Sequence, residues 1–424
     1  MNYQQATSFL EKLEKFGIKL GLEQTAELFR RSDSPDKKLK FIHLAGTNGK
    51  GSCAAMIEGA LRHCGFKTGM YTSPHLISPC ERIRINGRAI SEEDFAVAVS
   101  RLQSRTDGMV LPTYFEFMTV MAAQCFAEAG VDFVIWETGM GGRFDSTNVV
   151  NPLCCAITGI ALEHQKYLGS NLSEIAFEKA GIIKYGKPVF CAEVPDEAAT
   201  VISACAKKLN VELKWCKGDI SDVEFKLNDN HFLQSFYYQN FKIELSLPGI
   251  MQRRNLKVVF EVLKYLSDEF GFNLQLALSG LCDVRWPARI QFLKNNIILD
   301  GAHNPDGASA LADALEEIFP NEKLSVIFAN FADKDTLGVL HELNRIAAEF
   351  IFIPLKIGDR SGCPPEDLLK MHCSISDSPA SLASSIKDAL KISKNPRTLI
   401  AGSLFLAGQI VTQFCSKEKI LNLD

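Results

Sequence analysis

The stretch FIHLAGTNGKGS, residues 41–52, joins a short apolar segment to a glycine-rich loop that contains Lys50 and Ser52. A run compatible with a helix, CAAMIEGAL, follows at residues 53–61. Glycines let the backbone N–H groups of such a loop turn inward, and the following helix N-terminus adds partial positive charge. Lys50 supplies a full positive charge, and the hydroxyl of Ser52 can bind a Mg²⁺ ion on the phosphates. The order of strand, loop and helix predicts a nucleoside triphosphate site, with an ordinary glycine-rich turn as the alternative.

The loop departs from the usual phosphate-loop pattern in its spacing. Gly51 stands between the lysine and the hydroxyl residue, and Gly46 lies closer to Gly49 than the usual pattern places its first two glycines. This spacing narrows the range of families to which the loop can belong.

The composition is typical of a soluble globular enzyme. The chain has 424 residues, of which 46% are hydrophobic and 23% charged, and its formal net charge is −4. This length predicts two or three domains, and the lack of a dense basic patch gives no indication of a nucleic-acid partner. No secretory signal or membrane-spanning apolar run is visible. The 13 cysteines are scattered without a CxxC pair, so we expect reduced thiols and a cytoplasmic protein with no membrane partner.

Apolar runs that read as strands alternate with stretches that read as helices. After a helical region over residues 1–40, strands are expected at 41–45, 66–71, 131–137, 154–160 and 188–192. Helices are expected at 52–64, 92–104, 115–129, 173–183 and 196–209. This alternation predicts a parallel sheet covered by helices.

Residues 222–247 break this rhythm, because apolar and polar residues alternate there as in a half-exposed antiparallel meander with turns near 228–230 and 238–240. A helix is expected at about 250–269. Pro287 interrupts regular structure in RWPAR, residues 285–289. Beyond it, strands are expected near 297–300, 324–329, 350–354 and 398–402, and helices near 307–319, 335–348, 379–392 and 404–415.

We therefore expect an α/β fold with two domains. An N-terminal P-loop domain, residues 1–288, has a mostly parallel sheet and a small antiparallel meander. A smaller, Rossmann-like α/β domain covers residues 289–424.

Polar residues follow several of the expected strands, where ligands of open α/β sheets bind. Glu137 ends one strand and is a candidate oxygen ligand for Mg²⁺, with a helix cap or surface ion pair as its alternative. His164 follows the next strand and could bind metal or phosphate, although a lone histidine is usually structural. Ser73 lies in a third such loop and could add a ligand to a second cation.

Other charged groups have both a functional and a structural interpretation. Lys179 lies on an expected helix, and the residue chemistry alone favours a solvated lysine. Arg82 could face a carboxylated substrate or form a surface ion pair. Asp300, at the end of a strand, could accept hydrogen bonds from a ribose, and His303 follows it beside two glycines, where a plain turn is the alternative.

Taken together, these segments resemble the folylpolyglutamate synthase and dihydrofolate synthase group of the Mur ligase family. The resemblance runs from about residue 18 to residue 415. The motifs that carry it are GTNGKGS (46–52), TSPHL (72–76), ERIRING (81–87), TYFE (113–116), ETGMGGRFDSTN (137–148), EKAGIIK (178–184), LDGAHNP (299–305), DKD (333–335) and GSLFL (402–406).

The resemblance implies roles for individual residues. The loop Gly46, Thr47, Asn48, Gly49, Lys50, Gly51 and Ser52 would hold ATP phosphates, with Gln252, Asn255, Arg289 and Asp300 near the nucleotide. Ser52 and Glu137 would bind one Mg²⁺, and Ser73, Glu137 and His164 a second. Lys179 matches a lysine that family members carbamylate. Arg82, Thr113, Phe115, Asp145 and Ser146 match positions around the pterin-bearing substrate. Lys50, Lys179, His164 and His303 are the candidate catalytic residues, and His303 is expected at the interdomain cleft.

Four positions depart from the family pattern. Glu163 stands in place of aspartate, Met251 in place of histidine, Ala288 in place of glycine and Gln291 in place of an acidic residue. None lies in the phosphate loop, but each could alter nucleotide geometry or substrate choice.

The implied reaction is ATP-dependent amide formation in folate biosynthesis. The γ-phosphoryl of ATP passes to the substrate carboxylate, and L-glutamate attacks the acyl phosphate while the C-terminal domain closes to exclude water. We expect a monomeric, bifunctional ligase that acts on dihydropteroate and on folyl-glutamates. The alternatives are a folylpolyglutamate synthase alone, a peptidoglycan-precursor ligase, which the TSPHL and ERIR elements disfavour, and a non-catalytic switch driven by ATP.

Overall fold

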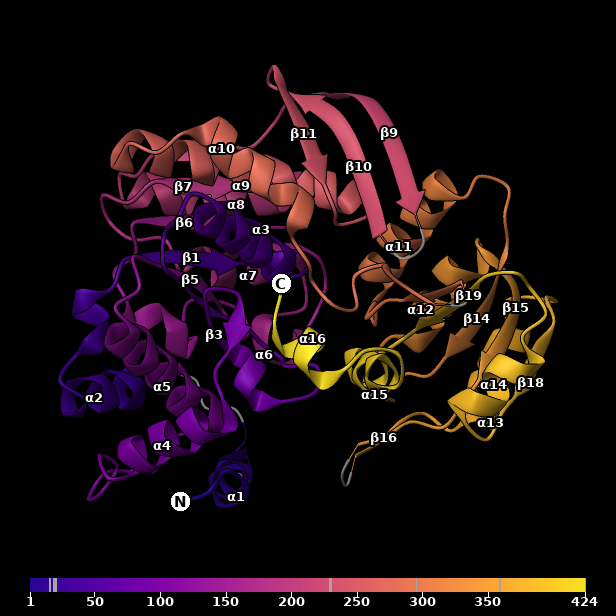
Figure 1. Ribbon diagram of the computed structural model, residues 1–424, viewed down its shortest axis with the longest axis horizontal. Helices are drawn as coiled ribbons and strands as arrows, with labels where there is room; N and C mark the ends of the chain where they lie inside the picture. The colour runs from indigo at the N-terminus through magenta and orange to yellow at the C-terminus, as the bar shows by residue number, and fades with distance from the viewer. Residues whose placement is uncertain (15–16, 18–20, 229–230, 295, 358–359, 424) are drawn as a thin grey trace. The chain divides into compact units, whose positions relative to one another are not determined.

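The computed structural model describes residues 1–14, 17, 21–228, 231–294, 296–357 and 360–423 (Figure 1). Contacts between residues divide the chain into two units. The first unit contains residues 1–219, 254–281 and 421–424, and the second contains residues 220–253 and 282–420. The expected boundary at residues 288 and 289 lies near the division at 281 and 282, whereas the meander groups with the second unit. The assignment of functional domains stays a prediction.

The strands of the first unit form one mostly parallel sheet. They are β1 (Phe41–Ala45), β2 (Thr68–Tyr71), β3 (Ile83–Ile85), β4 (Arg88–Ala89), β5 (Phe133–Glu137), β6 (Cys154–Ile157), β7 (Val189–Cys191) and β8 (Leu213–Trp215). Their order is β4-β3-β2-β5-β1-β6-β7-β8, with β3 and β4 antiparallel at one edge. Strand β1 lies between β5 and β6, and all of its residues are buried, which explains its apolar sequence.

Helices cover both faces of this sheet. They are α1 (Tyr3–Glu14), α2 (Glu23–Arg31), α3 (Lys50–His63), α4 (Glu92–Gln103), α5 (Tyr114–Ala129), α6 (Gln165–Leu168), α7 (Leu172–Ala180), α8 (Asp196–Lys208) and α10 (Leu274–Ser279), and α9 (Ile250–Phe270) begins in residues of the second unit. Short 3-10 helices are η1 (Pro35–Lys38), η2 (Pro79–Arg82), η3 (Ser146–Val149) and η4 (Gly280–Asp283). Figure 1 shows α3 and α10 together on one side of β1 and β5, with α5 on the other.

One face of the sheet carries two hydrophobic clusters. In the first, Phe41 and Trp136 pack with α4 and α5. In the second, Ala45 and Ile157 pack with α7 and α8. The carboxyl ends of β1, β5 and β6 are therefore fixed by a dense core, which gives the loops that follow them a rigid base.

The second unit contains the meander and a separate sheet. The meander consists of β9 (Ile220–Asn228), β10 (His231–Tyr238) and β11 (Phe241–Leu245), all antiparallel. The sheet has the order β12 (Gln291–Leu293), β13 (Ile297–Leu299), β19 (Thr398–Ala401), β14 (Leu324–Phe328), β15 (Ala347–Phe352) and β18 (Ala380–Leu382), with β12 and β13 antiparallel. Strands β16 (Lys356–Ile357) and β17 (Arg360–Ser361) form a small hairpin.

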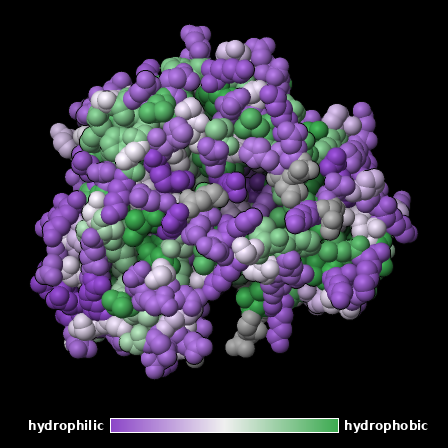
Figure 2. All heavy atoms as spheres, viewed as in Figure 1, coloured by the Kyte–Doolittle hydropathy of each residue, from purple (hydrophilic) through white to green (hydrophobic). Residues whose placement is uncertain are grey.

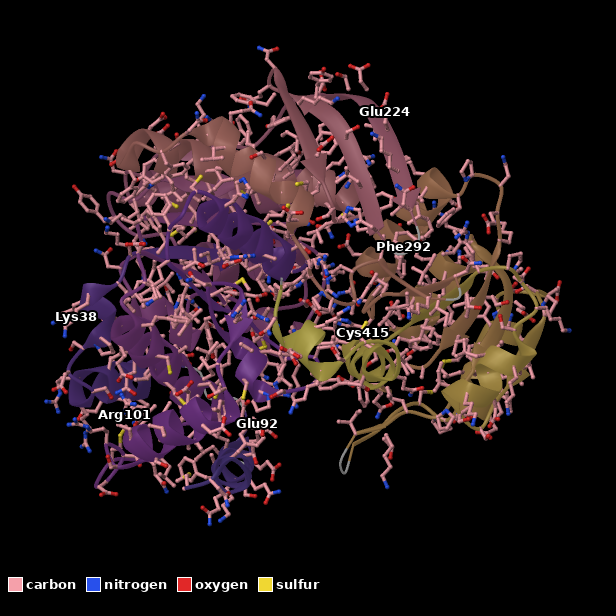
Figure 3. The ribbon with its side chains drawn as sticks, in the orientation of Figure 1. Lys38, Glu92, Arg101, Glu224, Phe292 and Cys415 are labelled. Carbon is pink, nitrogen blue, oxygen red and sulfur yellow. The ribbon has the colours of Figure 1, made fainter. Side chains whose placement is uncertain are left out.

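The helices of the second unit are α11 (Pro305–Ile318), α12 (Thr336–Asn344), α13 (Pro365–Cys373), α14 (Ile386–Ile392), α15 (Leu404–Phe414) and α16 (Lys417–Leu421). Exposure alternates along β9, where Glu224, labelled in Figure 3, is exposed. The ring of Phe292 stacks on that of Phe232 at 5.7 Å, so an aromatic contact joins β12 to the meander within this unit.

The α/β fold class expected from the sequence is confirmed, and the expected strands and helices of the first unit are present with ends shifted by up to three residues. Two helix predictions were wrong in part. The helix expected near 335–348 ends at Asn344, and residues 347 and 348 already belong to β15. Residues 380–382 of the helix expected at 379–392 form β18, which pairs with β15, and the helix begins only at Ile386 after the N-cap Ser385. Pairing at the sheet edge overrides the helix propensity of Ala380 and Leu382. The expected turn at residues 229 and 230 and the expected helix at 15, 16 and 18–20 lie outside the described residues.

The last described residues pack on the β3–β4 hairpin of the first unit. Arg84 Nη1 donates to the carbonyl oxygen of Leu421, and the N–H of Leu423 donates to the carbonyl of Gly87 at 3.1 Å. The visible face of the molecule is mostly hydrophilic, with small apolar patches (Figure 2). Among the helices that the structure describes, none has the length and apolarity needed to cross a membrane.

Candidate active site

The glycine-rich loop joins β1 to α3 at the middle of the first sheet. Gly49 is the N-cap of α3 with φ of 92°, and Gly46 has φ of 154°. A Cβ atom on Gly49 would lie 2.4 Å from Oδ1 of Asn255, and one on Gly46 would lie 1.8 Å from Oγ1 of Thr158. Both positions therefore require glycine. The geometry places the predicted nucleotide residue Asn255 directly against the loop.

Lys50 begins α3, two residues earlier than expected, and its side chain folds over the loop. Its Nζ atom donates to the carbonyl oxygens of Gly46 at 2.8 Å and Thr47 at 3.2 Å. Ser52 is buried in the first turn of the same helix. The cation and the hydroxyl thus lie at a helix N-terminus, where an anion is stabilised.

Residues 158–161, directly after β6, form hydrogen bonds that hold this loop in place. No prediction from the sequence included this contact. The N–H of Thr47 donates to the carbonyl of Gly159 at 2.7 Å, and its hydroxyl exchanges hydrogen bonds with the backbone of Ala161. Thr158 Oγ1 donates to the carbonyl of Asn48 at 2.7 Å. A hydroxyl residue directly after a buried strand is the signal that could have indicated this role.

Glu137 and Ser73 lie together, as expected for residues at the ends of neighbouring strands. Glu137 ends β5 and is buried, and Oε2 of its carboxylate accepts a hydrogen bond from the N–H of Ser73 at 3.2 Å. Among the described residues, no group of three or more His, Cys, Asp or Glu side chains is arranged to hold a metal ion. A Mg²⁺ ion here would therefore need oxygen ligands from phosphates and water besides the protein, which is how Mg²⁺ is usually bound.

Lys179 is a buried amine in the last turn of α7. Burial lowers its pKa to about 7, with a further contribution from the positive charge of Lys50, while Glu163 and Asp145 act in the opposite direction. Asp145 belongs to the loop after β5, and the N–H of Arg143 in that loop donates to the carbonyl of Glu178 at 2.7 Å. The structure therefore places Lys179 among charged groups of the phosphate loop and the β5 loop, and the solvated alternative is wrong.

His164 is exposed and adopts a left-handed conformation with φ of 51° just before α6. Its Nε2 atom lies 3.8 Å from Oε1 of Glu163, the residue that departs from the family pattern. Its metal role stays a prediction.

The predicted substrate residues have defined local contacts. Arg82 Nε donates to Nδ1 of His75 at 2.9 Å, and its guanidinium lies 5.1 Å from the ring centroid of Tyr114. Burial and the charge of Arg82 lower the pKa of His75 to about 3, so this ring is a neutral acceptor. Thr113 is the N-cap of α5 in a capping box with Glu116, which gives it a structural role beside any substrate contact.

Phe115 packs against the loop after β5, and Asp145 belongs to that loop. The ring of Phe115 packs so closely on Gly139 that a Cβ there would approach it to 2.5 Å. Asp145 is buried, and its carboxylate accepts hydrogen bonds from the N–H of Met140 at 2.8 Å and of Thr147 at 3.0 Å. Burial raises the pKa of Asp145. Ser146, which follows Asp145, is also buried.

Three predicted residues gather at the end of β13 in the second unit. The carboxylate of Asp300 accepts hydrogen bonds from the N–H of Ile290 at 2.8 Å and of Ala302 at 2.7 Å. Arg289 Nη1 donates to the carbonyl of Ala288 at 2.9 Å, and Nδ1 of His303 lies 2.9 Å from the carbonyl oxygen of Gly301. Gln252 is buried in the first turn of α9.

Comparison with known proteins identifies the family. A model of the Mur ligase glutamate ligase domain matches residues 288–404. A dihydrofolate synthase/folylpolyglutamate synthase of Bacillus subtilis is 37% identical over 363 residues, which cover 81% of this chain and 83% of the relative.

The chain belongs to the dihydrofolate synthase/folylpolyglutamate synthase family.

Solved structures of this family agree with that conclusion. Mycobacterium tuberculosis folylpolyglutamate synthase complexed with ADP and AMPPCP matches with a TM-score of 0.86 and 26% identity over 98% of this chain and 99% of that chain. E. coli FolC in complex with DHPP and ADP matches with a TM-score of 0.82 and 28% identity over 96% of this chain and 97% of that chain. The predicted family, the two-part α/β architecture and the assignment as an ATP-dependent ligase are confirmed. As a dihydrofolate synthase/folylpolyglutamate synthase family member, the chain is an enzyme and not a non-catalytic switch.

Proposed function

We propose that this chain joins the amine of L-glutamate to a carboxylate of a pteroyl compound and converts ATP to ADP and phosphate. The acceptors are dihydropteroate, which gives dihydrofolate, and the glutamyl tail of reduced folates, which gives folylpolyglutamates. The observation that carries this proposal is the 37% identity over 81% of the chain to a relative whose name combines both activities. Folylpolyglutamate synthesis alone is the competing function.

The phosphate loop supports the first step. A carboxylate is a poor electrophile, so its oxygen first attacks the γ-phosphorus of ATP, and the bond to the β-phosphate oxygen breaks to release ADP. The acyl phosphate then accepts the amine of glutamate, and the tetrahedral intermediate expels phosphate. Such a transfer depends on positioning and charge neutralisation. In this proposal Lys50 and the loop amides would hold the phosphates during this transfer.

The side chains near the loop fit Mg²⁺ by their donor chemistry. Ser52 and Glu137 would hold one ion, and Ser73, Glu137 and His164 would help to hold a second. The contact between Ser73 N–H and Glu137 Oε2 at 3.2 Å brings two of these residues together. Bound Mg²⁺ would neutralise charge on the phosphate oxygens.

Lys179 supports a carbamate at this site. The ammonium first loses a proton, and the neutral amine then attacks CO₂ to form a carbamate and releases a second proton, so that a cation becomes an anion. With a pKa of about 7, buried Lys179 is largely neutral just above that pH, unlike an ordinary lysine. The resulting carbamate would lie close to the charge of Lys50.

The remaining residues would bind substrates. Arg82, Thr113, Phe115, Asp145 and Ser146 would form the pteroyl site, Gln252, Asn255, Arg289 and Asp300 would contact the nucleotide, and His303 would serve in catalysis. We further propose a cytoplasmic monomer that acts on small molecules, without nucleic-acid or membrane partners. Sedimentation at enzyme-assay concentration tests the monomer.

The decisive experiment measures ADP and phosphate release with each substrate omitted in turn. Both products are expected only when ATP, L-glutamate and a pteroyl acceptor are all present. Dihydropteroate and tetrahydrofolate are supplied in separate reactions. If the products appear in the complete reaction with tetrahydrofolate but not in that with dihydropteroate, the enzyme is a folylpolyglutamate synthase only. If neither acceptor supports product release, the proposed function is contradicted.

A further inference from the structure

Thr147 is held by two neighbouring strands of the central sheet. His43 on β1 and Trp136 on β5 are register partners in parallel strands, so their side chains lie on the same face. His43 Nε2 lies 2.9 Å from Thr147 Oγ1, and Trp136 Nε1 donates to the Thr147 carbonyl at 3.1 Å. All three side chains are fully buried. The strands therefore fix both the backbone and the hydroxyl of Thr147.

Thr147 in turn holds the carboxylate of Asp145. Its hydroxyl donates to Asp145 Oδ1 at 2.5 Å, and its N–H donates to the same oxygen at 3.0 Å. The second oxygen, Oδ2, accepts the N–H of Met140 at 2.8 Å. Both carboxylate oxygens thus accept hydrogen bonds from the protein, which leaves Asp145 little freedom to rotate.

The direction of the hydrogen bonds follows from counting protons. A threonine hydroxyl has one proton, and if it donates to Asp145 it can only accept from His43. His43 must then carry its proton on Nε2, and burial, with the nearby charge of Lys184, lowers the pKa of this ring to about 3, which makes it neutral. The chain of bonds runs from His43 through Thr147 and ends on Oδ1 of the Asp145 carboxyl group.

We propose that Thr147 and His43 are positioning residues that orient the Asp145 carboxylate toward the N–H donors of the pteroyl ring. This inference rests on the proposed function, because it gives Asp145 a substrate to recognise. His43 also belongs to the strand that ends at the phosphate loop, with Gly46 directly after β1. One strand thereby sets the position of both the phosphate-binding loop and the acceptor-binding carboxylate.

The test compares Thr147→Val, which removes the hydroxyl, with Thr147→Ser, which keeps it. Removal of the hydroxyl takes away a buried hydrogen bond to Asp145 and one to His43, so Thr147→Val should raise the KM for dihydropteroate about tenfold or more. The KM for ATP should change less than about twofold, and Thr147→Ser should restore most of the loss. The control is Thr138→Val in the same loop, because the Thr138 hydroxyl is equally buried and has no hydrogen-bond partner among the described residues.

A double-mutant cycle tests the chain of bonds itself. His43→Leu should raise the KM for dihydropteroate in the same direction, and the double variant with Thr147→Val should be no worse than Thr147→Val alone, because residues in one network are not additive. Additive effects, or equal rises in the KM for ATP and dihydropteroate, would overturn the positioning role.

Two further outcomes separate this inference from the proposed function. If the unmodified enzyme does not use dihydropteroate, the dihydrofolate synthase part of the proposed function fails, and the same variants are then measured with tetrahydrofolate. If the unmodified enzyme is active and Thr147→Val keeps its KM for the acceptor, only the inference fails. Should Thr147→Val not fold, His43→Leu still tests the inference, because leucine fills much of the space of the buried ring but cannot donate to the Thr147 hydroxyl.

Discussion

The backbone N–H of Ala288 donates a hydrogen bond to Oε1 of Gln291 at 3.1 Å, which joins two of the four positions that depart from the family pattern. Ala288 is buried with φ of 58°, a left-handed conformation that glycine adopts without strain and alanine does not. The usual glycine at this position is thereby explained. Gln291 supplies a neutral acceptor for the N–H of the strained residue.

Ala288→Gly should therefore stabilise the protein. Relief of the left-handed strain outweighs the extra entropy of glycine in the unfolded chain, and we expect a gain of about 1 kcal/mol in the free energy of unfolding. Urea denaturation monitored by circular dichroism measures this change in the free energy of unfolding. Ala312→Gly, in the middle of α11, is the matched control and should lose about 1 kcal/mol. A urea midpoint for Ala288→Gly below that of the unmodified protein would contradict the inference that Ala288 is strained.

Lys50→Ala should lose at least about a hundredfold in ATP-dependent amide formation, since one stabiliser of transition-state charge is typically worth that much. The fold should persist, because the Lys50 amine bonds only to loop carbonyls in the contacts described. Turnover is measured by ADP release, and folding by circular dichroism. The exposed Lys208 at the end of α8 provides the control, as Lys208→Ala should keep full activity.

Lys179→Ala should be inactive, and short carboxylates such as acetate should restore part of its activity by replacing the carbamate. The unmodified enzyme should also lose activity in CO₂-depleted buffer and regain it with bicarbonate. Steady-state rates with and without acetate give the measurement. Full activity of the alanine variant would remove the carbamate from the mechanism.

The lowered pKa of Lys179 also predicts how stability depends on pH. Its pKa is about 7 in the folded protein and 10.5 ordinarily. Between these two values only the unfolded state binds the proton, so the free energy of unfolding should rise with pH, by up to about 1.4 kcal/mol per pH unit. Below pH 7 both states bind the proton and the dependence ends. Lys179→Met, compared across this range by urea denaturation in CO₂-depleted buffer, should lack the rise.

Glu137→Gln should raise the Mg²⁺ concentration needed for half-maximal activity by about tenfold or more, because a neutral amide is a weaker ligand for a hard cation. Activity is titrated against MgCl₂ at saturating ATP. Glu197→Gln, at the exposed start of α8, is the control and should leave the titration unchanged. An unaltered Mg²⁺ requirement for Glu137→Gln would exclude it as a ligand.

The sequence predicted those parts of the molecule that local patterns encode. The buried strand before Gly46 and the helix after it follow from apolar periodicity and glycine spacing, and Glu137 and Ser73 meet because parallel strands end at one edge. Contacts between distant segments leave no such pattern. Nothing in the composition around His43 indicates that it reaches Thr147, which lies 104 residues later.

The same limit applies to energies and backbone strain. Residue chemistry favoured a solvated Lys179, and only its burial accounts for the lowered pKa. Similarly, Ala380–Leu382 has good helix formers, yet pairing with β15 makes it a strand. The sequence identifies Ala288 as a departure from the family pattern, but the positive φ of this residue is known only from the structure.

The return of Leu421 and Leu423 to the β3–β4 hairpin has a topological consequence for the polypeptide. Residues 282–420 enter from one segment of the first unit and leave into another, so they are anchored at both ends. A protease that cuts once near residue 282 would leave the two pieces associated, because residues 421–423 of the second piece pack on the first unit and residues 220–253 of the first piece belong to the second unit. The second unit consists of two segments, 220–253 and 282–420. Its release from the first unit therefore requires a cut on each side of both segments.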